Sequence, residues 1–257
     1  MNFSKIFVPA MIFSFLLLAS CGDSSSESGA GGGEQDATVK AYPDSVGDIV
    51  FSDGTAVSYG VGLVLSGEQK SKAVAVIFYK EAGKMLGVGL RHDKAGRIWC
   101  DTSAQAYSRN LPGITCTATR LSDGSFSFSG DIDGSDNIDQ IGLSDSYIQW
   151  RYPAFYYAIN YKNEFSRVKG TRYESGWYLP SVAELYNIWK NKEIVDAAIL
   201  IAGGDSFDLD NYWSSSVDGE NESCASRLLF AYGTPDSSCK KYKERCVCAV
   251  REFLGRN

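Results

Sequence analysis

The segment 130–139, GDIDGSDNID, gathers the densest set of oxygen ligands in the chain. Calcium prefers carboxylate and amide oxygens, so the segment is a candidate calcium site. Its spacing differs from that of an EF-hand, because the glycine comes too early and Gly142 stands where the last glutamate would be. The alternative is a structural turn in which Asx side chains bond the local backbone. The candidate ligands are Asp131, Asp133, Asp136 and Asp139.

Cys21 is a candidate for covalent modification because it follows an apolar N-terminal stretch. Residues 1–20 carry one early cation, Lys5, and then an uncharged run that ends in small residues, as in a signal peptide. The sequence LASC at 18–21 resembles the lipobox of bacterial lipoproteins. That resemblance implies cleavage before Cys21 and palmitate-type acylation, which would anchor the chain in a membrane. The alternative is an ordinary secretory signal followed by a chance cysteine.

The six remaining cysteines predict disulfide bonds, because an exported protein folds where thiols oxidise. Cys100 and Cys116 lie far from the others and are the expected pair. Cys246 and Cys248 share one side of a predicted strand, so we expect them to reach back to the other two. A zinc site is the rival hypothesis, which the lack of any CxxC pair and the single histidine disfavour. The disulfide candidates are Cys100, Cys116, Cys224, Cys239, Cys246 and Cys248.

The residue types in the sequence give little support for a catalytic site. His92 is the single histidine, and its place at a predicted strand end favours a turn cap over a general base. A Cys–His nucleophile pair would need a free thiol, and paired carboxylates occur in any acidic chain of this size. The sequence therefore predicts a protein that is not an enzyme and has no cofactor beyond the candidate calcium.

Composition separates a tether from a folded part. Residues 22–38 contain no aromatic and no aliphatic side chain larger than alanine, so 21–38 is predicted to be a lipidated cysteine and a disordered tether. A Gly/Ser-rich chain of this length reaches roughly 20–25 Å. The formal net charge is −6 and no Lys/Arg stripe is present, which argues against a nucleic-acid partner.

Short apolar runs and turn residues predict antiparallel strands in the first part of the folded region and again near its end. Residues 101–148 are polar and weakly periodic. Pro153 is suited to open a helix, and Ser181 with Glu184 has the spacing of a capping box. A further helix around 194–201 is expected to stop at Gly203-Gly204. The expected strands are 48–51, 55–59, 73–79, 85–90, 97–100, 212–216, 225–233 and 245–251.

The motifs GWYLPSxxEL, YWSSS, LxFxxG and CVCAVREF follow one another in this order. In this order they resemble the C-terminal domain family of bacterial collagen-like adhesins (the Lcl C-terminal family), as carried by surface lipoproteins of host-associated bacteria. The resemblance covers nearly all of 45–253. It implies an α+β, C-type-lectin-like fold of twisted antiparallel sheets with two to three short helices. The N-terminal β-rich part, 39–150, and the lectin-like part, 151–257, would form one continuous module.

Two relatives of that fold have activities that this sequence does not support. The calcium-dependent sugar motifs EPN, QPD and WND of animal C-type lectins are absent, and so is the RGGSW pattern of formylglycine-generating enzymes. Fold similarity alone does not give function.

The resemblance implies a ligand surface in the long C-terminal segment, 208–245, which is polar and rich in aromatics. Tyrosine supplies contact area at low entropic cost, while Asn and Asp supply adaptable hydrogen bonds. Solvated loop residues are the alternative, with Trp213 expected in the core. The candidate ligand-binding residues are Asp210, Asn211, Tyr212, Asn221, Arg227, Tyr232 and Tyr242.

Two functions follow as hypotheses. The first is a lipid-anchored protein of the bacterial outer membrane or cell surface, an adhesin or recognition module for a glycan or protein. The second is a structural envelope lipoprotein that docks a partner in its own envelope. An enzyme of the formylglycine-generating type is the least favoured of the three.

Overall fold

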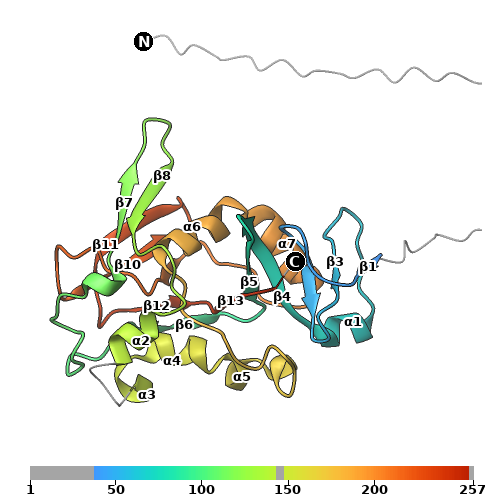
Figure 1. Ribbon diagram of the computed structural model, residues 1–257, viewed down its shortest axis with the longest axis horizontal. Coiled ribbons are helices and arrows are strands. Elements are labelled where there is room, and N and C mark those ends of the chain that lie inside the picture. Colours follow the sequence, from blue (N-terminus) through green and yellow to red (C-terminus); the bar gives the residue numbers. More distant parts are fainter. Residues whose placement is uncertain (1–37, 143–147, 255–257) are drawn as a thin grey trace, which may run out of the picture. The chain divides into compact units, whose positions relative to one another are not determined.

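The computed structural model describes residues 38–142 and 148–254 (Figure 1). Cys21, the predicted signal peptide and nearly all of the predicted tether lie outside these residues. Residues from Gln35 onward cluster as one compact unit. No helix within 38–142 or 148–254 is long and apolar enough to cross a membrane.

One large sheet has six strands in the order β1-β3-β2-β4-β5-β13. The predicted hairpin at 48–59 is confirmed, with Gly54 in the left-handed region at φ +97°. The predicted buried strand at 73–79 is also confirmed and forms the middle of the sheet. The strands are β1 (Val39–Lys40), β2 (Ile49–Phe51), β3 (Ala56–Val57), β4 (Ala73–Glu81), β5 (Lys84–Gly89) and β13 (Val250–Glu252).

A second sheet has five strands in the order β11-β10-β9-β12-β6. The strand expected at 97–100 lies earlier, as β6, because Trp99 and Cys100 turn away to bond the carbonyl of Lys241. The strand expected at 245–251 is in fact two, since the chain leaves this sheet after Val247 and joins the other at Val250. The strands are β6 (Asp93–Ile98), β9 (Asn211–Trp213), β10 (Cys224–Leu229), β11 (Thr234–Lys240) and β12 (Glu244–Val247).

The described residues contain seven α-helices, more than the two or three predicted. The extra helices are short turns within polar segments, whose patterns carry no 3.6-residue period. The predicted helices at 153 and 182 are confirmed. The helices are α1 (Gly67–Lys72), α2 (Asn137–Gly142), α3 (Ile148–Arg151), α4 (Pro153–Ile159), α5 (Tyr161–Glu164), α6 (Val182–Lys190) and α7 (Lys192–Ile201), with 3₁₀ turns η1 (Pro112–Ile114) and η2 (Ser166–Val168).

The capping box of α6 also anchors the aspartate-rich loop. Ser181 accepts from the amide of Glu184, and Glu184 Oε2 accepts from the amides of Ser181 (2.8 Å) and Gly134 (3.1 Å). Tyr178 donates to Glu184 Oε1 at 2.9 Å. A side chain at Gly134 would meet the Ser181 amide at 2.6 Å, so glycine is required for this close approach. The buried carboxyl of Glu184 therefore joins two parts of the chain.

The two-stranded hairpin of β7 (Cys116–Arg120) and β8 (Phe126–Gly130) projects from the body (Figure 1). Its base is held by backbone bonds from Cys116 to Val217 O (2.8 Å) and from Asp131 to Thr115 O (2.8 Å). Gly130 has φ +90°, and a Cβ there would lie 2.4 Å from Thr115 O. This fixed base places one wall of the site described next.

Candidate functional site

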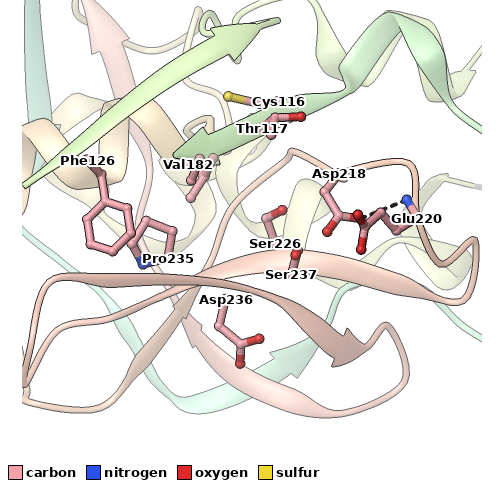
Figure 2. A pocket seen from close by; sticks show the side chains of 11 residues that line it. Cys116, Thr117, Phe126, Val182, Asp218, Glu220, Ser226, Pro235, Asp236 and Ser237 are labelled. Atoms are coloured by element: carbon pink, nitrogen blue, oxygen red, sulfur yellow. Dashed lines mark hydrogen bonds between the residues drawn. The ribbon is translucent and has the colours of Figure 1, made fainter. Parts of the chain in front are cut away.

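A cavity of about 280 Å³ lies between the β7–β8 hairpin and the strands β10 and β11 (Figure 2). The hairpin, the first residue of α6, the loop after β9 and both strands contribute to its wall. None of its lining residues is a lysine or arginine. The lining residues are Cys116, Thr117, Ala118, Phe126, Val182, Asp218, Glu220, Ser226, Pro235, Asp236 and Ser237.

Ser226 is the buried polar group of the cavity. Its side chain lines the cavity although the residue is only 3% exposed. Its backbone amide donates to Ser216 O (2.8 Å) and its carbonyl accepts from Ser214, but its hydroxyl has no hydrogen-bond partner in the described part of the chain. Solvent reaches this oxygen through the cavity, so the hydroxyl is free to bond water or a ligand there.

Three carboxylates surround the cavity, and only one of them is neutralised. Arg227 donates to Asp236 Oδ2 from Nε (2.9 Å) and Nη2 (2.7 Å), and Ser238 binds the other oxygen. Burial opposes ionisation of Asp236, yet the bonds from Ser238 and Arg227 outweigh it and lower its pKa. Asp218 Oδ1 accepts from the amide of Glu220 at 3.0 Å (Figure 2), and neither of these two carboxylates forms an ion pair within 38–142 or 148–254. The cavity therefore carries negative charge.

Phe126 supplies the apolar wall of the cavity. Its ring lies edge-on to Tyr186 of α6 at a centroid distance of 5.9 Å, and its amide donates to the Tyr186 hydroxyl at 3.2 Å. Both contacts fix the ring beside Val182 and Pro235. An aromatic face next to carboxylates and hydroxyls is the combination found where polar ligands with one apolar face are bound.

The predicted ligand residues are not gathered at one place. Tyr212 is wrong as a ligand contact, because its side chain is fully buried and its hydroxyl accepts from the amide of Asp208 (3.2 Å). Tyr232 is 75% exposed at the β10–β11 turn, and Tyr242 is exposed beside Tyr107. Arg227 alone acts at the cavity, through Asp236. Trp213 lies in the core as expected.

The other three predicted ligand residues are engaged in local bonds. Asp210 accepts from both the amide and the side chain of Asn211, at 2.7 and 2.9 Å. Asn221 forms an Asx turn with Ser223 and lines a small, separate cavity next to Lys241. The wall residues of the hairpin were not predicted, since 101–148 gave no assigned strands. The alternation of Phe126 and Phe128 after an SDG turn was the available signal.

Two of the aspartates predicted to bind calcium accept hydrogen bonds in local turns. Asp131 accepts from the amide of Asp133 (3.2 Å), and Asp133 accepts from Ser135 (3.0 Å) and pairs with Lys84 (2.5 Å). Asp136 and Asp139 are exposed. Within the ranges that the structure describes, no group of three or more acidic, histidine or cysteine side chains is placed to hold a metal. These bonds agree with the turn alternative, and calcium binding stays a prediction.

The described cysteines are buried, and no disulfide bond joins any two of them. Cys100 and Cys116 were the expected pair, but Cys116 packs with Val182 and Ala183 in a cluster separate from the main core. Cys224 stands opposite Lys240, and Cys239 opposite Ala225, so the two side chains project from opposite faces of the sheet. Strand β12 ends before Cys248. The predicted pairings therefore differ from the structure.

Burial also governs the titratable groups that could act as nucleophile or base. It raises the pKa of Cys116 to about 12, with Asp131 adding to the effect, and that of Cys246 to about 11. His92 packs on Phe207 at 4.1 Å, and neither imidazole nitrogen has a hydrogen-bond partner in the described ranges, so the expected turn cap is wrong. Burial lowers the pKa of His92 to about 3. These groups are neutral at physiological pH.

Comparison with known proteins informs the fold. No family model matches the chain, and no curated protein matches it. The structure is similar to that of a fimbrial protein from Bacteroides ovatus, with a TM-score of 0.52 and 15% sequence identity. The match covers 81% of this chain and 49% of that one, so this chain spans about half the length of the fimbrial protein. The shared feature is an α+β fold built on antiparallel sheets.

Proposed function

We propose that the protein is a lipid-anchored binding protein of the bacterial cell surface, and that the cavity beneath the β7–β8 hairpin is its ligand site. Anchoring is supported by the LASC sequence at 18–21 and the tether-like composition of 22–38. The lectin-like resemblance supports a recognition module over an enzyme. The ligand class is an external glycan or protein segment.

The single observation that carries this proposal is the hydroxyl of Ser226, which opens into the cavity from a residue only 3% exposed and has no hydrogen-bond partner in the described residues. Such a hydroxyl can donate one hydrogen bond and accept two from a group that enters the cavity. Phe126 and the unpaired Asp218 and Glu220 surround this hydroxyl with one apolar face and several acceptors. This arrangement suits a polar ligand of about monosaccharide size.

Binding is tested with the compact unit from Gln35 onward, screened on a glycan array and a panel of matrix proteins. A saturable hit should weaken roughly tenfold or more in Ser226→Val or Asp218→Asn, since each removes a hydrogen bond to the ligand. Tyr232→Ala is the matched control, because Tyr232 is exposed outside the cavity. A hit that weakens only in the control would move the site to the β10–β11 turn and refute the proposal for the cavity.

Location is tested on intact cells that produce the full chain. A surface protein is cut by added protease before the cells are broken, whereas an envelope-docking protein is cut only afterwards. Replacing Cys21 by alanine should release the protein from the membrane fraction. Protection on intact cells would favour the second hypothesis, a structural envelope lipoprotein.

A further inference from the structure

The charge balance of the cavity narrows the chemistry of its ligand. Asp218 and Glu220 line it without an ion-pair partner in the described residues, and no lysine or arginine contributes to the wall. Arg227 is already engaged by Asp236. A neutral or anionic ligand would leave two carboxylates uncompensated as it displaced their water, while a cationic ligand would form charge-assisted hydrogen bonds.

The hydroxyl groups of the wall narrow the chemistry further. Thr117, Ser226 and Ser237 line the cavity, and none of their side-chain oxygens is bonded within the described ranges. A lysine ammonium offers only three donors on a single nitrogen. The three hydroxyls and two carboxylates come from separate elements of the fold. A ligand that bonds all of them therefore needs donors and acceptors at several of its atoms. A sugar ring carrying a free amine has this distribution, and its apolar face matches the ring of Phe126 (Figure 2).

We infer that the cavity recognises an amino sugar whose amine is unsubstituted, an inference that rests on the proposed function. The ammonium is placed between the carboxylates of Asp218 and Glu220. The ring hydroxyls bond Ser226 and its neighbours Thr117 and Ser237, and Phe126 covers one face of the ring. N-acetylation removes the charge and adds bulk at the same nitrogen, so the acetylated sugar is rejected.

The test uses the full-length protein in detergent micelles and two probes that differ only at nitrogen, a glucosamine oligomer and an N-acetylglucosamine oligomer of equal length. Titration calorimetry should show the glucosamine oligomer binding roughly tenfold or more tightly. Affinity should fall when the pH rises above the pKa of the ligand's amine. The double variant Asp218→Asn/Glu220→Gln should lose the preference between the two probes.

A matched control separates the cavity from general attraction to an acidic protein. Asp123→Asn removes an exposed carboxylate at the tip of the hairpin, outside the cavity, where Asp123 accepts hydrogen bonds from Ser125. This variant should bind like the wild type. If it weakens binding as much as the double variant does, the attraction is diffuse and the inference is overturned.

The remaining outcomes distinguish this inference from the function beneath it. Equal binding of the two oligomers that is still sensitive to Ser226→Val would refute the cation preference and retain the cavity as a ligand site. A lysine-rich peptide that binds more tightly than either oligomer would replace the sugar by a peptide. If the folded protein binds neither oligomer, the amino sugar is excluded as the ligand. Hits on the glycan array that Ser226→Val does not weaken would also refute the proposal that the cavity is the ligand site.

Discussion

The carboxyl of Glu184 provides the sharpest quantitative test of the structure. Burial raises its pKa to about 7, although the amide of Ser181 opposes the shift. Its ordinary value is 4.5. Glu184→Gln mimics the neutral carboxyl, because an amide oxygen can accept from Ser181 and Gly134 while the amide nitrogen donates to Tyr178.

The sign and size of the effect follow from linkage. A carboxyl whose pKa is raised on folding binds more protons in the folded state, so its contribution to stability is full below pH 4.5 and is lost as pH rises through about 7. The shift corresponds to about 3 kcal/mol. The hydrogen bond from Lys84 lowers the pKa of Asp133, although burial opposes this shift. Asp133 therefore loses its contribution to stability only in more acidic solution, below the pH range in which Glu184 titrates.

Urea unfolding at pH values from below 4.5 to above 7 measures this directly. The free energy of unfolding of the wild type, minus that of Glu184→Gln, should fall by about 3 kcal/mol across the window. Glu68→Gln is the control, because Glu68 is exposed, its bond from Lys72 lowers its pKa, and any small effect has the opposite sign. A difference for Glu184→Gln that does not vary with pH would refute the account of its burial.

Three further outcomes are expected. Gly130→Ala should destabilise the fold by about 1–3 kcal/mol in urea unfolding, because its backbone is left-handed and its Cβ would meet Thr115 O. Gly124→Ala, at the open tip of the hairpin, should destabilise the fold less. An equal loss of stability in the two variants would contradict the close approach of Gly130 to Thr115. Calcium should leave the melting temperature unchanged, since Asp133 is occupied by Lys84, and a rise that saturates with calcium would restore the metal site. Native Cys116 should react with a maleimide far more slowly than in urea, because burial raises its pKa to about 12, whereas fast native labelling would show that the thiol is accessible.

The parts of the fold that were predicted are those in which local signals and packing agree. The capping box at Ser181, the helix opened by Pro153 and the apolar strand at 73–79 each carry a pattern that tertiary contacts reinforce. The hairpin of β7 and β8 was missed because its residues are mostly polar and exposed. Such a hairpin is stabilised by its base, where Cys116 bonds Val217 and Gly130 lies against Thr115, and not by a buried face.

The site was harder to predict because its parts are remote in sequence. The pairing of Thr115 with Val217 and the start of α6 help to bring together Phe126, Val182, Asp218 and Ser226. Polarity and aromatic content pointed to the C-terminal segment that supplies part of the cavity wall, but they could not separate buried Tyr212 from exposed Tyr232. Pairing of strands, and not residue type, decides which polar groups share a cavity.

The crossing of the chain between the two large sheets, at Cys248 and Ala249, has a consequence for how the protein folds. Arg251 pairs with Gly87, and Arg245 with Arg97, so both sheets are completed by the C-terminal strands. Until these strands arrive, β5 and β6 each lack a neighbour, and pairing segments so far apart is slow. During this time the open edges of β5 and β6 can pair with other chains.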